Sequence, residues 1–327
     1  MTRFQDGCFL VDNSLIEKIT TCPTKADFAY GQNRVPAGNQ AALRFGLHIH
    51  SALALRNAKL FANVENDEEE QIALLTKDFT DTPLEDEGWR NLDSAVKVIK
   101  GYNACKIFNK SDEHILAHPK TGGPLIEQSL AIDTKRVISG HRIIYIGRID
   151  RIMKLPDGIF VRDYKTTTML GDMTWSEAQM SEQLKGYCWA YRETFGEEPL
   201  GYCYDVLAIN ESIQNAIFDE ILGKIIPAPL KNGKESKAMP LRFESQRFFT
   251  REPAGQLDEW FENMLQQVET FLWHHSRGIY PHHHRHCRHQ YGLCEYFGVC
   301  SLPERSRASA LASNAFKPDE WSPLHHK

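Results

Sequence analysis

Apolar positions in the first third of the chain recur with helical spacing. The pattern predicts helices over residues 39–58, 66–80 and 87–108, the first of them rich in alanine and leucine. A shorter helix is expected near Ser14, because Ser14 and Glu17 have the spacing of a capping box. The first third of the chain is therefore predicted to be helical.

The middle of the chain changes to the pattern of buried strands. The strand-like runs are residues 125–132, 143–155, 159–165, 202–209 and 241–249. The turn Pro156-Asp157-Gly158 separates the second run from the third. Helical patterns return over residues 175–195 and 252–277. Helices and strands in this order predict a layered α/β fold.

Two acidic residues stand at the ends of apolar strands. Asp150 closes the segment Gly147-Arg148-Ile149-Asp150, and Asp163 lies two residues before Lys165. Such acids are costly there unless they are paired or bound to a cation. Alternate strand residues share a face, so Asp163 and Lys165 project together, beside Asp150 if the two strands pair. This arrangement would bind a divalent metal and an activated water, as phosphodiester hydrolysis requires. For each acid alone, a surface carboxylate is the alternative.

A histidine lies on the helix predicted over residues 39–58. Leu43, Leu47 and His50 fall on one helical stripe, which predicts that His50 faces the interior while His48 points elsewhere. Gly46, one turn before His50, leaves room for another segment of the chain. A packed core histidine is the alternative to a metal ligand at this position.

Three cysteines cluster late in the chain, at Cys287, Cys294 and Cys300, and Cys22 stands far upstream. Three thiolates and one more make a site that holds zinc or a [4Fe–4S] cluster. Nearby histidines leave a mixed cysteine–histidine zinc site open: His282, His283, His284, His286 and His289. The other cysteines have the character of small apolar positions: Cys8, Cys105, Cys188 and Cys203.

Composition and charge add bounds to this picture. The chain has 327 residues, of which 42% are hydrophobic, enough for one large domain or two small ones. The net charge of −5 neither indicates nor excludes nucleic acid binding. No apolar run is long enough to span a membrane. Eight cysteines without an export signal predict reduced thiols and a cytoplasmic protein.

Taken together, these segments resemble the RecB-like branch of the PD-(D/E)XK nuclease superfamily, including its AddB-type iron–sulfur members. Six motifs occur in the same order: a Cys-Pro segment, a Gly-x-x-x-His helix, a Gly-Arg-Ile-Asp strand, an Asp-x-Lys strand, a Gln-x-x-x-Tyr helix and a three-cysteine cluster. The resemblance implies an α/β, restriction-endonuclease-like fold. Its central mixed sheet would be flanked by helices, with an N-terminal helical region and a C-terminal cysteine-cluster segment.

The resemblance implies a role for each motif of the nuclease core. The catalytic residues would be Asp150, Asp163 and Lys165. The ligands of Mg²⁺ or Mn²⁺ would be His50, Asp150, Asp163 and the carbonyl of Tyr164. Glu127 fits an additional acid on the preceding strand.

The remaining motifs correspond to contacts with DNA and to a cofactor. Gln183 and Tyr187 match DNA-contacting residues on a helix; taken alone, this pair would be read as a plain helix surface. The expected ligands of a structural [4Fe–4S] cluster are Cys22, Cys287, Cys294 and Cys300. The resemblance favours an iron–sulfur cluster over zinc, because the order of the cysteines matches the iron–sulfur members of the family. Paired Cys-x2-Cys knuckles, common in zinc modules, are also absent.

One nuclease domain is expected over residues 1–304. Its predicted parts are a helical portion over residues 39–112, a catalytic core over residues 113–250, and a C-terminal helix and cluster segment over residues 251–304. Residues 305–327 are expected to form a loosely ordered tail.

The resemblance implies a metal-dependent DNA exonuclease in recombination, repair or replication. Its substrate would be single-stranded DNA or DNA with free ends. The chain has no Gly-x-x-x-x-Gly-Lys-Ser/Thr phosphate loop, so any motor would be a separate helicase or recombination protein. The alternatives are a nuclease acting on RNA and a catalytically weak, nuclease-fold DNA-binding or assembly subunit.

Overall fold

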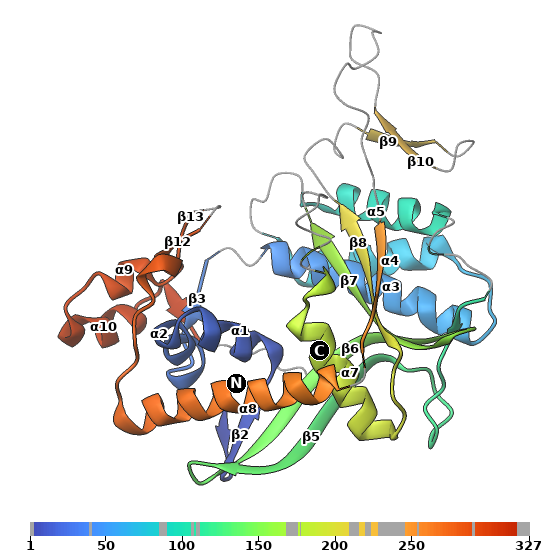
Figure 1. The fold of residues 1–327 in the computed structure, drawn as a ribbon. Coiled ribbons are helices and arrows are strands. Elements are labelled where there is room, and N and C mark those ends of the chain that lie inside the picture. The colour runs from blue at the N-terminus through green and yellow to red at the C-terminus, as the bar shows by residue number, and fades with distance from the viewer. Residues whose placement is uncertain are drawn as a thin grey trace, which may run out of the picture.

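A computed structural model gives the arrangement of most of the chain (Figure 1). The described residues are 3–38, 41–84, 90–105, 108, 112–167, 176, 178–208, 216–219, 224–227, 246–253, 255–289 and 292–318. Among these residues, no helix combines the length and the apolar character needed to cross a membrane.

The chain begins with short elements and continues into three longer helices. The short elements are β1 (Phe4–Gln5), β2 (Cys8–Val11), α1 (Asn13–Thr21), α2 (Pro23–Ala26), a π-helical turn η1 (Asp27–Gly31) and β3 (Val35–Pro36). The longer helices are α3 (Ala41–Phe61), α4 (Glu68–Asp81) and α5 (Leu92–Ala104).

Strands come next, together with a helix. These elements are β4 (His114–Ile115), β5 (Ile126–Ile138), β6 (His141–Leu155), β7 (Gly158–Thr167), α7 (Glu182–Phe195), β8 (Gly201–Ala208), β9 (Ala216–Asp219), β10 (Lys224–Pro227) and β11 (Gln246–Arg251). In the described part of the chain, β9 and β10 pair only with each other. The last elements are α8 (Gln256–Arg277), a 3₁₀ turn η4 (His284–Cys287), β12 (Arg288–His289), β13 (Gly292–Leu293), α9 (Phe297–Cys300), α10 (Glu304–Leu311) and β14 (Phe316–Lys317).

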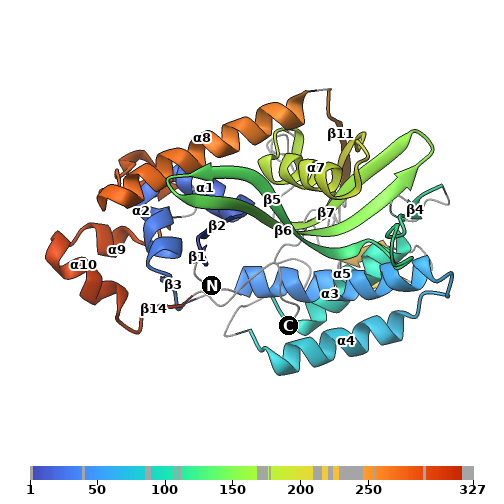
Figure 2. The ribbon, with the colours of Figure 1, turned by 90° about the horizontal axis from the view of Figure 1, so that it is seen from below.

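Within the described residues, the central sheet has eight strands of mixed direction. Six run in the order β1-β2-β6-β7-β8-β11, and β4 and β5 also pair with β6. The pairs β2–β6 and β7–β8 are parallel, whereas the other pairs are antiparallel. Helices α7 and α8 cover one face, and α3, α4 and α5 cover the other (Figure 2). This arrangement confirms the predicted mixed α/β fold.

Capping residues decide where the helices begin: α5 starts at Leu92, five residues after the predicted start at residue 87, and α7 starts at Glu182, seven residues after the predicted start at residue 175. α5 begins after Asn91 and α7 after Ser181, and each side chain accepts a backbone hydrogen bond from the first turn. α7 ends at Gly196, which adopts the left-handed conformation that favours glycine. The predicted capping box at Ser14 is wrong, because Asp12 caps α1 by accepting from the backbone N–H of Leu15 at 2.8 Å.

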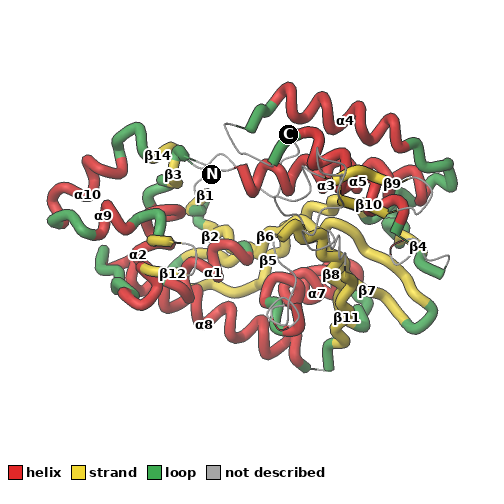
Figure 3. Tube along the Cα trace, turned by 90° about the horizontal axis from the view of Figure 1, so that it is seen from above, coloured by secondary structure: helices red, strands yellow, loops and turns green. Residues whose placement is uncertain are grey.

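The C-terminal elements lie beside the N-terminal ones at one end of the molecule, and α3, α4 and α5 lie at the other (Figure 3). β14 pairs with β3, and the hydroxyl of Tyr296 donates to the carbonyl of Arg34 at 2.7 Å. Residues 305–318, expected as part of a loose tail, therefore contain most of α10 and the paired strand β14. Residues 319–327 lie outside the described part of the chain, as do residues 241–245 of the predicted strand 241–249.

Candidate active site and cysteine centre

Strands β6 and β7 bring the two predicted carboxylates together. Their antiparallel register ends at the pair Arg151 and Arg162, so Asp150 and Asp163 come next along the two strands. Both acids are buried. The backbone N–H of Tyr164 donates to Asp150 Oδ2 at 2.8 Å, which fixes that carboxylate against β7.

The face of β7 that carries Asp163 also carries the predicted lysine. Lys165 Nζ lies 3.1 Å from Asp163 Oδ2 and donates to Gln183 Oε1 at 2.8 Å. Although burial opposes charging of Lys165, the carboxylate of Asp163 outweighs it and raises the pKa of the lysine. The side chain is still 44% exposed, so a substrate can reach the ammonium group.

His50 reaches the acids from α3, as predicted, but not for the predicted reason. Leu43 and Leu47 of the proposed buried stripe are 58% and 43% exposed. His48, expected to point elsewhere, is 6% exposed and packs on Phe79. The helix buries the neighbouring stripe that begins at Phe45, because that face meets α4 and α5.

His50 is held by two oxygen acceptors in this structure. Its Nδ1 lies 3.3 Å from Asp150 Oδ2, and its Nε2 lies 2.9 Å from the carbonyl oxygen of Tyr164. Both nitrogens can donate only in the imidazolium form. Burial opposes that form, but Asp150 and two further acids outweigh it and raise the pKa of His50 to about 9. Gly46 faces Thr166 Oγ1, where a Cβ atom would lie 3.4 Å away, so the helix approaches β7 closely.

Glu127 joins this group through an unusual backbone conformation. In β5 its neighbours Ile126 and Gln128 pair with Arg151 and Ile149, which places Glu127 opposite Asp150. Glu127 has a φ of 48°, a left-handed conformation that is uncommon for a non-glycine residue. Burial and the charge of Asp150 raise the pKa of Glu127 to about 7.

A divalent cation fits this donor set. Ligand atoms of His50, Glu127 and Asp150 all lie within 4.8 Å of one another, and the carbonyl of Tyr164 adjoins them. Asp163 is not a member of this close trio; its buried Oδ2 faces Lys165 Nζ at 3.1 Å. One imidazole and several oxygens suit Mg²⁺ or Mn²⁺. Glu127, assigned least firmly from the sequence, is thus one of the three residues of this trio.

Gln183 and Tyr187 lie one turn apart on α7, as the spacing predicted. Gln183 accepts from Lys165 and donates through Nε2 to the Tyr187 hydroxyl at 3.0 Å. Tyr187 is buried, at 8% exposure, and a Cβ atom on Gly147 would lie 3.0 Å from its ring. In this structure the two residues therefore form a hydrogen-bonded chain from Tyr187 through Gln183 to Lys165.

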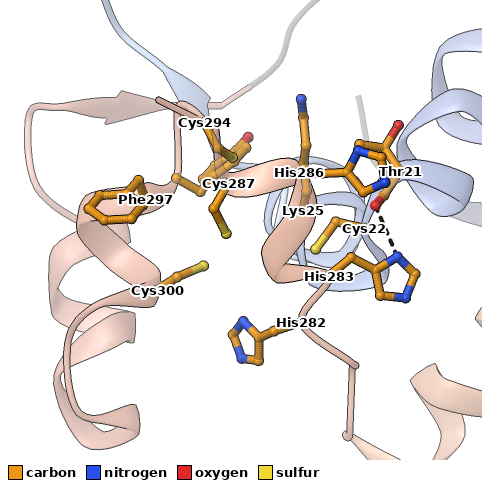
Figure 4. Close-up of a pocket in the computed structure, with 11 residues that line it drawn as sticks. Thr21, Cys22, Lys25, His282, His283, His286, Cys287, Cys294, Phe297 and Cys300 are labelled. Carbon is orange, nitrogen blue, oxygen red and sulfur yellow. Dashed lines mark hydrogen bonds between the residues drawn. The ribbon is translucent and has the colours of Figure 1, made fainter. Parts of the chain in front are cut away.

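The four predicted cysteines surround one pocket (Figure 4). Cys22 precedes α2, Cys287 ends η4, Cys294 precedes α9, and Cys300 ends α9. All are free thiols. Burial and the neighbouring thiols Cys22 and Cys294 raise the pKa of Cys300 to about 11. Such thiols ionise together only when a cation compensates their charge, so the donor set fits a metal or an iron–sulfur cluster.

Other side chains hold the segments around this pocket. Thr24 Oγ1 donates to the carbonyl of Pro281 at 2.9 Å, and Lys25 Nζ lies 3.0 Å from Glu295 Oε1. His282, His283 and His286 also line the pocket, whereas Cys8 and Cys105 do not. Cys188 and Cys203 are buried core residues, as expected from their small apolar character.

A polar network that the sequence analysis missed lies on the opposite face of β6, β7 and β8. Arg151 and Arg162, each adjacent to one of the two site acids, are buried there with Asp205. Arg162 lies 2.7 Å from Glu113 Oε2, and Arg247 Nε lies 2.6 Å from Asp205 Oδ1. Charged residues inside otherwise apolar strands are the signal that the sequence offered for this network.

Comparison with known proteins assigns the family. The sequence model of the PD-(D/E)XK nuclease superfamily matches residues 13–301, a range that includes the acidic site and all four cysteines. A search of curated proteins finds no significant match. Members of this superfamily are nucleases that typically use divalent metal ions, in agreement with the donor set around His50, Glu127 and Asp150. The chain belongs to the PD-(D/E)XK nuclease superfamily.

Proposed function

We propose that the protein is a DNA nuclease, acting as an exonuclease, that hydrolyses phosphodiester bonds with Mg²⁺ or Mn²⁺. The observation that carries the proposal is the meeting of His50, Glu127 and Asp150 next to the Asp163–Lys165 pair. Ion pairs account for Lys165 with Asp163 and for His50 with Asp150, but they do not account for Glu127, a further carboxylate in the same group.

The residues at the site divide into ligands and a charge-stabilising group. His50, Asp150, Asp163 and the carbonyl of Tyr164 would hold the metal, with Glu127 as a further carboxylate. When bound, such an ion lowers the pKa of a water molecule and offsets charge on the phosphate. Lys165 would orient that water or stabilise charge that develops on phosphorus. Its raised pKa favours the protonated form, which suits the second role.

Gln183 and Tyr187 are proposed to serve the DNA-binding face of the site. The hydrogen bond from Lys165 to Gln183 makes the glutamine a positioning residue for the lysine. Gln183 would contact the DNA backbone and at the same time orient Lys165. Tyr187 would fix the glutamine by accepting its hydrogen bond.

We propose that Cys22, Cys287, Cys294 and Cys300 hold a structural [4Fe–4S] cluster. Four thiols around one pocket supply the ligand number that such a cluster requires. The cluster would join segments more than 260 residues apart in sequence, next to the existing hydrogen bond from Thr24 to Pro281. Zinc on the same thiols is the weaker candidate.

The proposed substrate is single-stranded DNA or DNA with free ends, in recombination, repair or replication. A separate helicase or recombination protein is the proposed partner. A nuclease acting on RNA and a catalytically weak DNA-binding subunit are the competing functions, and an intact set of Asp150, Asp163 and Lys165 speaks against the second.

Digestion of labelled nucleic acids tests these proposals together. The metal-loaded protein is incubated with end-labelled single-stranded DNA, double-stranded DNA, a closed DNA circle and RNA. Shortening of linear DNA from its ends, with the circle intact and activity lost in chelator, is the expected result. Cutting of the circle would show that the protein is an endonuclease rather than an exonuclease. Faster digestion of RNA than of DNA would show that RNA is the substrate. Binding of DNA without any cleavage would favour the assembly subunit.

A further inference from the structure

Tyr164 connects two proposed metal ligands through its backbone. Its N–H donates to Asp150 Oδ2 at 2.8 Å, and its carbonyl oxygen lies 2.9 Å from His50 Nε2. The position of this one peptide segment therefore sets where the histidine of α3 meets the acid of β6. Anything that fixes Tyr164 also fixes the relative placement of these two ligands.

The side chain of Tyr164 projects from the face of β7 opposite to Asp163 and Lys165, and it packs among residues of α3 and α5. It is fully buried and packs edge-on against Tyr102. Its hydroxyl accepts a hydrogen bond from Asn57 Nδ2 at 2.9 Å. Asn57 is 1% exposed, and its Oδ1 accepts from Arg151 Nη1 at 3.1 Å.

These contacts form a closed circuit around the site. Asn57 lies seven residues after His50 on α3, which is two helical turns, so both side chains project from the same side of that helix. The helix thus grips Tyr164 twice, at the carbonyl through His50 and at the hydroxyl through Asn57. Arg151, which completes the circuit, follows Asp150 directly on β6.

We propose that Asn57 is a positioning residue for the metal site, acting through the hydroxyl of Tyr164 and the guanidinium of Arg151. If the Asn57 amide is removed, α3 keeps only the hydrogen bond from His50 to the Tyr164 carbonyl. The distance between His50 and Asp150 is then less firmly fixed. Groups that orient metal ligands in this way change metal affinity about 10- to 100-fold when they are removed. The inference rests on the proposed metal-dependent function.

Calorimetric titration of the metal-free protein with Mn²⁺ tests the role without depending on cleavage. Tyr164→Phe removes a single oxygen atom, and Asn57→Ala removes the amide. We expect each variant to bind Mn²⁺ at least about 10-fold more weakly than wild type. The double variant should bind about as weakly as the single ones, because both changes break the same link. Asn103→Ala is the matched control, since that amide bonds Glu68 and Gln71 on the helical side, away from the metal ligands.

Thermal unfolding of the same proteins separates positioning from packing. A lower melting temperature in Asn57→Ala and Tyr164→Phe with unchanged Mn²⁺ affinity would overturn the proposed role, as would equal weakening by Asn103→Ala. Failure of the wild-type protein to bind Mn²⁺ would instead overturn the metal-dependent function on which the role rests.

Discussion

Lys165 donates a hydrogen bond to Gln183 Oε1 at 2.8 Å, across the interface between β7 and α7. The lysine is thus held by two neighbours on different elements, Asp163 at its own strand and Gln183 on the helix. Because Gln183 is in turn bonded to the buried Tyr187, the orientation of the ammonium group depends on the packing of α7.

Gln183→Ala should therefore lower the rate of cleavage more than it weakens metal binding. A misplaced catalytic group costs about 100-fold in rate. The measurement is single-turnover cleavage with Mn²⁺ in excess, together with DNA affinity by fluorescence anisotropy. Unchanged kinetics and DNA affinity in both Gln183→Ala and Tyr187→Phe would show that these two residues only pack α7 and have no role in cleavage or DNA binding.

The affinity for Mn²⁺ should rise as the pH increases from about 6 to 9. In the metal-free protein the pKa of Glu127 is raised to about 7 and that of His50 to about 9, so both groups hold protons that the metal must displace. Calorimetry in buffers of different ionisation enthalpy will measure the released protons. Affinity that is flat across this range, with no proton release, would remove both residues from the ligand set.

The metal-free protein should lose stability as the pH rises from about 4.5 to 9. Folding raises the pKa of Glu127 above its ordinary value, and that of His50 likewise, so the folded state binds more protons than the unfolded state in this range. Burial also raises the pKa of Asp163 to about 6, so Glu127→Gln should reduce, but not abolish, the loss of stability below about pH 7, as followed by chemical denaturation. A variant whose stability has the same pH dependence as wild type would contradict the shifted pKa of Glu127.

The buried charge network should matter for stability rather than for chemistry. Asp205→Asn removes the carboxylate that faces Arg162 and Arg247, leaving buried guanidinium groups short of a counter-charge. The expected loss in the free energy of unfolding is about 3–5 kcal/mol, measured in urea. Asp133→Asn, which breaks an exposed pair with Arg142, is the control and should have little effect. Equal effects of the two changes would show that burial does not decide the cost.

Loss of one cysteine should abolish the proposed cluster. Protein purified without oxygen should be brown and carry about four irons per chain. Cys22→Ser should lose both the colour and part of the thermal stability, because the cluster would bridge α2 and α9. Cys105→Ser, outside the pocket, is the control. Colourless protein with one equivalent of zinc would replace the iron–sulfur assignment and leave the nuclease proposal intact.

Local pattern was sufficient for much of the fold and for part of the site. Apolar runs placed β6 and β7. The two acids, expected at the ends of these strands, lie inside them instead, and the antiparallel pairing of β6 with β7 brings the carboxylates together as predicted. The helical stripe failed for α3, because the stripe through Leu43 cannot be distinguished by hydrophobicity from the one through Phe45 that meets the neighbouring helices.

Longer-range features had no local signal. The left-handed backbone of Glu127 depends on how β5 pairs with β6, and this pairing cannot be read from the residues next to Glu127 in the sequence. In the sequence Asn57 is an ordinary polar residue of a helix, and its role depends on the contact between α3 and Tyr164. The pairing of β14 with β3 likewise joins residues 35–36 to residues 316–317. The Ser- and Ala-rich composition of the tail gave no sign of this strand pairing.

Cleavage of end-labelled DNA by Lys165→Ala is the decisive measurement for the proposed function. This change leaves the metal ligands in place and removes the charged group beside Asp163. Turnover should fall by at least about 100-fold while Mn²⁺ binding is retained. Wild-type protein treated with a chelator should not cut at all. Full activity of Lys165→Ala, or cleavage by the chelated protein as fast as by the Mn²⁺-loaded one, would contradict the assignment of this site to metal-dependent phosphodiester hydrolysis.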